Sequence, residues 1–194
     1  MLKVVITGPE STGKSTLASA LSKHFHTELL HEYARAYLET KLALEKLKNN
    51  IKKAFLYDES DFYSMYLGQK QLEEFTLKTA KDKHNLVIFD TDALTYKIWY
   101  AEVFKNSDNA LLNNINFGEE TPQIGDIQTL YLLCSPQAIV WQPDPLRENP
   151  NDRDRLFDIY EKELITHKKT YFILRGSKNE RLTDAINTIE SFIN

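Results

Sequence analysis

The chain has 194 residues, of which 42% are hydrophobic, enough to form the core of one globular domain over residues 1–194 and too many for a disordered chain. Its formal net charge is −4, so no overall positive field favours nucleic acid or an anionic membrane surface as a partner. A single cysteine, Cys134, excludes an internal disulfide framework and the zinc sites that several cysteines build.

Five short apolar runs are predicted to form parallel strands. They are Leu2–Thr7, Glu28–His31, Asn85–Phe89, Thr129–Cys134 and Thr170–Leu174. Continuous apolar runs are typical of strands that helices cover on both faces. Helical patterns lie between or after them, at Ser15–Phe25, Met65–Ala80, Arg155–Thr166 and Glu180–Ile193. The alternation predicts a three-layer α/β fold with an open parallel sheet of about five strands, and with Thr40–Lys53 and Lys105–Ile127 as excursions from it.

A phosphate-binding motif follows the first strand. Residues 8–15 read Gly-Pro-Glu-Ser-Thr-Gly-Lys-Ser and match G-x-x-x-x-G-K-[ST] between a predicted strand and a predicted helix. Backbone N–H groups of such a loop bind phosphates, Lys14 can bridge the β- and γ-phosphates, and Ser15 can bind Mg²⁺. The motif therefore predicts a nucleoside triphosphate site made by Gly8, Glu10, Ser11, Thr12, Gly13, Lys14, Ser15 and Thr16.

Two charged residues, Glu32 and Arg35, follow the second predicted strand. This position places them at the carboxyl edge of the sheet, where open α/β folds bind ligands. Glu32 can accept a proton from an attacking hydroxyl, and Arg35 can stabilise a transferred phosphate. The alternative interpretation is a surface ion pair in the first turn of a helix.

Further along, Asp61, Phe62, Met65, Gly68 and Gln69 recur at one-turn spacings and share one face of a predicted helix. This face is expected to line a pocket. Phe62 and Met65 fit a core position equally well, and Asp61 is expected either to cap the helix or to bind a hydroxyl.

The third strand leads directly into Asp90, with Asp92 two residues later. An aspartate at the end of a buried strand beside a P-loop is expected to hold Mg²⁺, directly or through water, next to Ser15. Asp92 has two interpretations, because it can face the substrate or cap a helix that starts near Ala93.

Three of the six arginines, Arg147, Arg153 and Arg155, lie close together after the fourth strand. Residues 143–155 are therefore predicted to form a lid, with Arg147 and Arg153 binding the transferred phosphoryl group. The interleaved acidic residues also fit an exposed, salt-bridged loop. Beyond the fifth strand, Arg181 is expected to stack on the nucleotide base, although the segment also reads as an ordinary turn.

Five segments, in this order, resemble the ribosylnicotinamide kinase domain of the NadR family: GPESTGKST, HEYAR, DFYSMYLGQ, VIFDTD and WQPDPLR. The resemblance spans residue 2 to about residue 181, nearly the whole chain. It implies a P-loop kinase that uses ATP and Mg²⁺ to convert nicotinamide riboside to its mononucleotide, a step of NAD biosynthesis. Carried over by position, the ATP–Mg²⁺ residues would be Lys14, Ser15 and Asp90. Glu32, Arg35, Asp61 and Gln69 would lie in or near the riboside pocket, and His31 and Phe62 would flank the nicotinamide ring.

Two other functions stay open at this point. The acceptor can be another nucleoside, or the P-loop can belong to an ATPase or nucleotide switch that acts on a protein partner. The sequence leaves open the oligomeric state, the preference between ATP and GTP, and which of Glu32, Asp61 and Asp92 is the acceptor carboxylate. No stretch approaches the roughly 20 apolar residues of a membrane span and no secretory signal is visible, so we expect a cytoplasmic protein without a nucleic acid or membrane partner.

Overall fold

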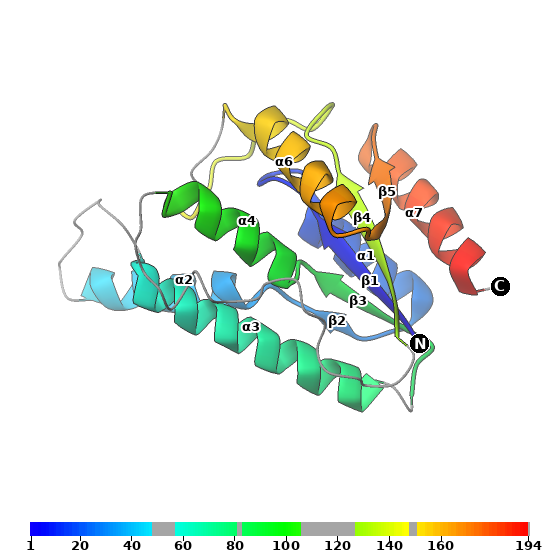
Figure 1. Ribbon diagram of the computed structural model, residues 1–194, viewed down its shortest axis with the longest axis horizontal. Coiled ribbons are helices and arrows are strands. Elements are labelled where there is room, and N and C mark those ends of the chain that lie inside the picture. Colours follow the sequence, from blue (N-terminus) through cyan, green and yellow to red (C-terminus); the bar gives the residue numbers. More distant parts are fainter. Residues whose placement is uncertain (48–56, 81–82, 106–126, 148–150, 194) are drawn as a thin grey trace.

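The computed structural model describes residues 1–47, 57–80, 83–105, 127–147 and 151–193. Its centre is one parallel sheet in the strand order β2-β3-β1-β4-β5 (Figure 1). The strands are β1 (Leu2–Thr7), β2 (Leu29–Leu30), β3 (Leu86–Asp90), β4 (Gln128–Cys134) and β5 (Thr170–Leu174). Strand β1 pairs in parallel with both β3 and β4, and all six of its residues are buried. The sheet therefore has the predicted open, five-stranded parallel architecture.

Helices cover both faces of the sheet, as the apolar strands require. They are α1 (Lys14–Phe25), α2 (Tyr33–Leu47), α3 (Glu59–Ala80), α4 (Ala93–Val103), α6 (Arg153–Thr166) and α7 (Lys178–Ile193). Val4 and Ile6 of β1 pack with α1 and α7, while Val5 packs on the other face with α3, α4 and α6. In Figure 1, α4 and α6 lie in front of the sheet and α1 lies behind it. The three layers of the predicted fold are thereby confirmed.

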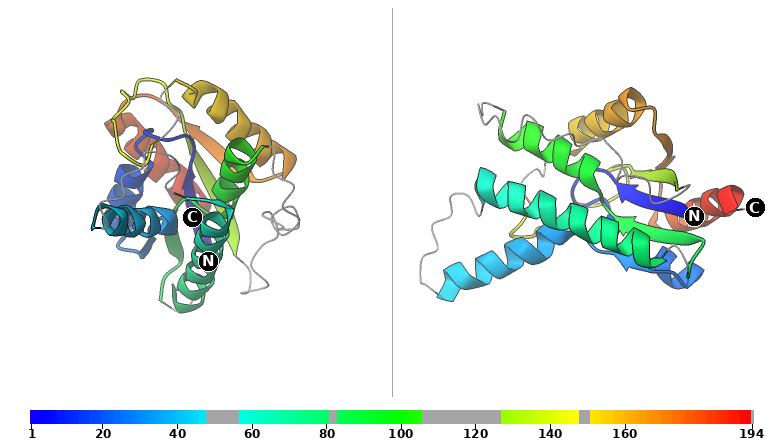
Figure 2. Two further views of the ribbon diagram at one scale, coloured as in Figure 1. Left: turned by 90° about the vertical axis from the view of Figure 1, so that its left-hand side faces the viewer. Right: turned by 60° about the horizontal axis from the view of Figure 1, so that its bottom comes forward.

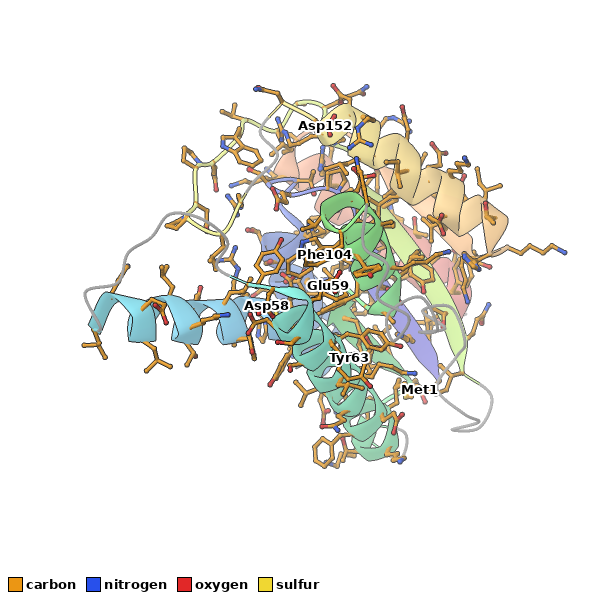
Figure 3. All side chains as sticks on the ribbon, turned by 60° about the vertical axis from the view of Figure 1, so that its left-hand side comes forward. Met1, Asp58, Glu59, Tyr63, Phe104 and Asp152 are labelled. Atoms are coloured by element: carbon orange, nitrogen blue, oxygen red, sulfur yellow. The ribbon has the colours of Figure 1, made fainter. Side chains whose placement is uncertain are left out.

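A third core lies away from the sheet, between α2, α3 and α4. It is built mainly from aromatic side chains, with Phe62 at its centre against Tyr96, Trp99, Tyr100 and Phe104 at ring-centroid distances of 5.4 to 5.9 Å. Figure 3 shows Phe104 beside the N-terminal end of α3, where Asp58 and Glu59 are labelled. Edge-to-face and tilted packing of this kind fixes α3 against α4. The C-terminal end of α2 extends away from the sheet (Figure 2).

Most element boundaries lie within one or two residues of the sequence prediction, and the differences at β2 and α3 have a physical reason. Strand β2 has two residues rather than four, because it is an edge strand that pairs only with β3. Helix α3 begins six residues before the predicted Met65, because the Asp58 carboxylate accepts hydrogen bonds from the backbone N–H groups of Ser60 and Asp61 and so caps an earlier turn.

The two predicted excursions lie largely where the structure gives no description. Residues 40–47 continue α2, as their helical propensity predicts, and residues 48–53 and 106–126 lie outside the described residues. Within the part of the chain that is described, no helix is long and apolar enough to cross a membrane.

Candidate active site

The P-loop, residues 8–15, adopts a backbone that its glycines make possible. Gly8, Ser11 and Gly13 have φ angles of 127°, 54° and 83°. A Cβ atom at Gly8 would lie 2.8 Å from the carbonyl oxygen of Cys134, so only glycine lets the loop pass this close to the end of β4. The loop leads straight into α1, whose first N–H groups are free to face an anion.

Side chains within the P-loop bind its own backbone. The Thr12 hydroxyl donates to the carbonyl oxygen of Pro9 at 2.9 Å, and the Lys14 ammonium donates to the same oxygen at 2.8 Å. The Ser11 hydroxyl accepts from the backbone N–H of Gln142 at 2.9 Å. The Lys14 side chain therefore reaches back across the loop to Pro9.

A cavity of about 370 Å³ joins the P-loop to the start of α2. The predicted site residues that line it are Gly8, Glu10, Ser11, Thr12, Gly13, Lys14, Ser15, Thr16, Glu32, Arg35 and Arg147. The motifs did not predict an apolar part of the cavity wall, which includes Leu38, Ile98, Trp99, Val103 and Leu146. The i, i+4 spacing of Trp99 and Val103 is the one sequence signal that could have pointed to it, and core residues of a helix share that spacing.

Glu32 lies in this cavity within reach of several charged groups. Burial raises the pKa of the Glu32 carboxyl above its usual value, Lys14 and Arg35 lower it, and Asp90 and Glu10 raise it. The net shift is upward. A carboxylate with a raised pKa beside a phosphate-binding lysine has the properties of a general base for a hydroxyl nucleophile.

The start of α2, directly after Glu32, is held by side chains from two other helices. The backbone N–H of Tyr33 donates to the side-chain oxygen of Gln69 at 3.0 Å, and that of Ala34 donates to the Tyr96 hydroxyl at 3.2 Å. These bonds satisfy two N–H groups that the first turn of a helix otherwise leaves without a partner. They also fix where the Glu32 side chain enters the cavity.

Gln69 belongs to a buried polar network rather than to the cavity wall. Its amide nitrogen donates to Glu73 at 3.1 Å, and Glu73 in turn pairs with Lys3 of β1 at 3.2 Å. Burial lowers the pKa of Lys3, but the Glu73 and Asp92 carboxylates outweigh it and raise the pKa overall, so Lys3 remains charged. Gln69 therefore supports the start of α2 from beside the cavity and does not line it.

Asp92 is buried and serves as a helix cap. One carboxylate oxygen accepts from the backbone N–H of Leu94 at 3.1 Å, and the other accepts from the Tyr131 hydroxyl at 2.7 Å. Of the two interpretations of Asp92, the structure shows the cap of α4. The Leu94 and Tyr131 contacts together account for both carboxylate oxygens, and Asp92 does not line the cavity.

Asp90 has the features expected of a metal ligand. It ends β3, it is 3% exposed, and its Oδ1 atom is buried without a hydrogen-bond partner. A buried carboxylate oxygen is rarely left without a partner unless an ion or water completes it. Carboxylate and hydroxyl oxygens are the ligands that Mg²⁺ prefers, so Asp90 and Ser15 fit a magnesium ion.

Three other predicted residues lie apart from the cavity wall. Phe62 is completely buried in the aromatic core, so in this structure it cannot flank a bound ring. His31 is exposed at the end of β2. Asp61 accepts from the Tyr37 hydroxyl at 2.7 Å and pairs with Lys41, and so ties α3 to α2. In this structure Phe62 therefore packs the aromatic core, and Asp61 holds two helices together.

The predicted lid, residues 143–155, is described apart from residues 148–150. Arg147 lines the cavity, and Arg155 binds Glu102 and Asp152 at the junction of α4 and α6. Asp144 pairs with Arg35 at 3.2 Å, which joins this segment to α2. Arg153 and Arg181 do not line the cavity, and each donates instead to a backbone carbonyl oxygen of the P-loop, Arg153 to Ser11 and Arg181 to Thr12.

Comparisons with known proteins agree with this architecture. The trifunctional NAD biosynthesis/regulator protein NadR of Salmonella typhimurium is 35% identical over 92 residues, which make up 47% of this chain and 20% of that protein. A crystal structure of NadR protein in complex with NR has a TM-score of 0.67 and 19% identity, over 97% of this chain and 50% of that chain. A deoxyadenosine kinase from M. mycoides has a TM-score of 0.56 and 14% identity, over 97% and 99% of the two chains.

This chain thus spans half or less of the NadR proteins that it matches. The similarity confirms the resemblance to NadR and the P-loop kinase-like fold. A family model described as an AAA domain matches residues 3–181. Since the match covers almost the entire sequence, the chain belongs to this AAA-domain family.

Proposed function

We propose that this protein is an ATP-dependent kinase that phosphorylates the 5′-hydroxyl of a riboside, with nicotinamide riboside as the acceptor. The observation that carries the proposal is that one cavity holds both the P-loop and the Glu32 carboxyl. A nucleotide switch needs the first of these and has no need of the second. The likeness to a NadR structure in complex with NR supports nicotinamide riboside among the possible ribosides.

The reaction follows from the positions of the charged groups. The acceptor oxygen forms a bond to the γ-phosphorus of ATP, the bond from that phosphorus to the bridging oxygen of ADP breaks, and Glu32 takes the hydroxyl proton. Lys14 and the P-loop N–H groups bind the phosphates, and Arg147 adds positive charge from the cavity wall. Asp90 and Ser15 would hold Mg²⁺, which supplies further charge neutralisation when bound.

The acceptor end of the cavity is suited to a flat ring. Trp99, Leu38 and Val103 form an apolar wall there, and the Trp99 indole nitrogen donates to the Tyr57 hydroxyl at 2.8 Å, which fixes the orientation of the indole. A fixed aromatic surface binds heteroaromatic rings by stacking, and it binds a cationic ring, such as the pyridinium of nicotinamide riboside, more strongly than a neutral one. We propose that Trp99 takes the place that the sequence analysis gave to Phe62.

Phosphate transfer from γ-labelled ATP to a panel of nucleosides tests the proposal. The panel contains nicotinamide riboside, adenosine, deoxyadenosine and thymidine, each with wild type, Glu32→Gln and the control Glu28→Gln. Glu28 has the same side chain as Glu32 but precedes β2 instead of following it, and it does not line the cavity. We expect transfer to nicotinamide riboside, a loss of about 10²- to 10⁴-fold in Glu32→Gln, and wild-type activity in Glu28→Gln.

The same assay separates the other functions. Transfer to another nucleoside in preference to nicotinamide riboside would keep the kinase and change its acceptor. ADP release that is independent of every acceptor would contradict the kinase and favour a nucleotide hydrolase or switch.

A further inference from the structure

Arg181 occupies an unusual position for an arginine on the first turns of a surface helix. It is 2% exposed, and its guanidinium donates to three backbone carbonyl oxygens. The acceptors are Gly176 at 2.9 Å, Thr12 at 3.0 Å and Gln137 at 2.8 Å, from three separate segments of the chain. No carboxylate appears among these acceptors. Burial accordingly lowers the pKa of Arg181, and the side chain stays charged because arginine titrates far above neutral pH.

One of these acceptors belongs to the P-loop. A trans peptide directs its C=O and the following N–H to opposite sides. Because the Thr12 carbonyl is bound to Arg181 on the outer side of the loop, the N–H of Gly13 is turned to the inner side. That side is the cavity, which Thr12 and Gly13 both line.

The neighbouring peptide is held in the same way. Arg153 donates to the Ser11 carbonyl at 3.2 Å, and it is itself fixed by two bonds of 3.1 Å to the Ile139 carbonyl. The N–H of Thr12 is therefore also turned toward the cavity. Two consecutive peptides of the P-loop thus have their carbonyl oxygens bound by arginines, from α6 and from α7.

We infer that Arg181, with Arg153 as its partner, is a positioning residue that preorganises the P-loop N–H groups for phosphate. This inference rests on the proposed nucleotide site, and it replaces the expectation that Arg181 stacks on the base. A preorganised loop binds phosphate without the entropy loss of ordering its peptides. Charge-assisted hydrogen bonds suit this purpose, because they are roughly twice as strong as neutral ones.

The test compares two Mg²⁺-bound probes, ATP and inorganic tripolyphosphate, by calorimetric titration of the full chain. Tripolyphosphate has no base, so stacking cannot contribute to its binding. The variant is Arg181→Lys, which keeps the charge but cannot reach three divergent carbonyls. One control is Arg175→Lys, an exposed arginine after β5, and the other is Ile189→Val, a buried change on the same helix α7 that lowers stability away from the P-loop.

We expect Arg181→Lys to lower the affinity for ATP and for tripolyphosphate by the same factor, about tenfold, while the two control variants bind both probes as wild type does. Weaker binding of ATP alone would assign Arg181 to the base and overturn the inference. Unchanged affinity for both probes, or an equal loss in Ile189→Val, would overturn it as well. If Arg181→Lys does not fold, Arg153→Lys takes its place in the test. It must weaken the binding of ATP and of tripolyphosphate by one common factor, which is smaller than the factor expected for Arg181→Lys.

The outcome is separable from that of the proposed kinase activity. A wild-type protein that binds both probes but phosphorylates no riboside would contradict the kinase and leave the inference standing on the two affinities. A wild-type protein that binds neither probe would overturn the inference together with the nucleotide site.

Discussion

A methyl group added at Gly68 tests how tightly α3 holds the start of α2. A Cβ atom at this position would lie 2.3, 2.5 and 2.7 Å from three ring atoms of Tyr33. Ordinary contact begins near 3.4 Å, so the ring must move by about 1 Å. Tyr33 directly follows Glu32, and its N–H is bound to Gln69, one residue beyond Gly68. Gly68→Ala should therefore disturb both stability and catalysis.

The magnitude follows from two opposing effects. Overpacking of this kind costs about 1–3 kcal/mol, while alanine in place of glycine inside a helix gains about 1 kcal/mol. Gly68→Ala should then lower the free energy of unfolding by about 0–2 kcal/mol. In a Tyr33→Ala background the clash is absent, and the same change should raise the free energy of unfolding by about 1 kcal/mol. The coupling energy between the two positions is therefore about 1–3 kcal/mol.

Urea unfolding of wild type, the two single variants and the double variant measures this coupling. Ser64→Ala, an exposed change one turn earlier on α3, is the control, and it should alter stability by no more than about 0.5 kcal/mol in either background. Phosphate transfer by Gly68→Ala should fall by up to about 10²-fold, since a shift of about 1 Å displaces Glu32. If Gly68→Ala stabilises both backgrounds equally and leaves transfer unchanged, the contact between α3 and Tyr33 does not position Glu32.

Three further outcomes are expected from single substitutions. Because the pKa of Glu32 is raised, the rate of phosphate transfer should increase with pH through a value above about 4.3, and this dependence should disappear in Glu32→Gln. The raised pKa also means that the fold favours the neutral carboxyl. The stability of wild type relative to Glu32→Gln should therefore be highest at low pH and fall as the pH rises through that pKa. Asp90→Asn should raise the Mg²⁺ concentration for half-maximal rate about 10- to 100-fold while riboside affinity is kept, and an unchanged Mg²⁺ profile would remove Asp90 as the ligand. Burial raises the pKa of Asp61, but Lys41, the Asp58 N–H and Tyr37 lower it more, so the Asp61 carboxylate stabilises the fold above about pH 3.9 and this stabilisation is lost as the pH falls through the folded pKa. Thermal unfolding of Asp61→Asn should therefore show a lower midpoint than wild type at pH 7. A difference from wild type that persists at the lowest pH would contradict this assignment.

The sequence by itself determined the sheet and the P-loop, because both depend on local signals. A run such as Leu2–Thr7 has to be buried on both faces wherever it lies, and Gly8 and Gly13 readily adopt the positive φ angles that the P-loop has at these two positions. The position of Glu32 was predictable for a similar reason. Parallel strands present their carboxyl ends at one edge, so a residue that follows β2 meets residues that follow β1.

Only the tertiary structure decided which side chains reach the cavity. Helical spacing put Phe62 and Gln69 on one face of α3, but the packing of α2 and α4 against that face buried both of them. The wall that contains Trp99 is assembled from helices distant in sequence, so no local pattern marks it. Arg181 likewise has two of its three acceptors, Thr12 and Gln137, in segments far away in the sequence. Spacing along a helix fixes which residues share a face, whereas the long-range packing of other elements decides whether that face becomes core, cavity or support.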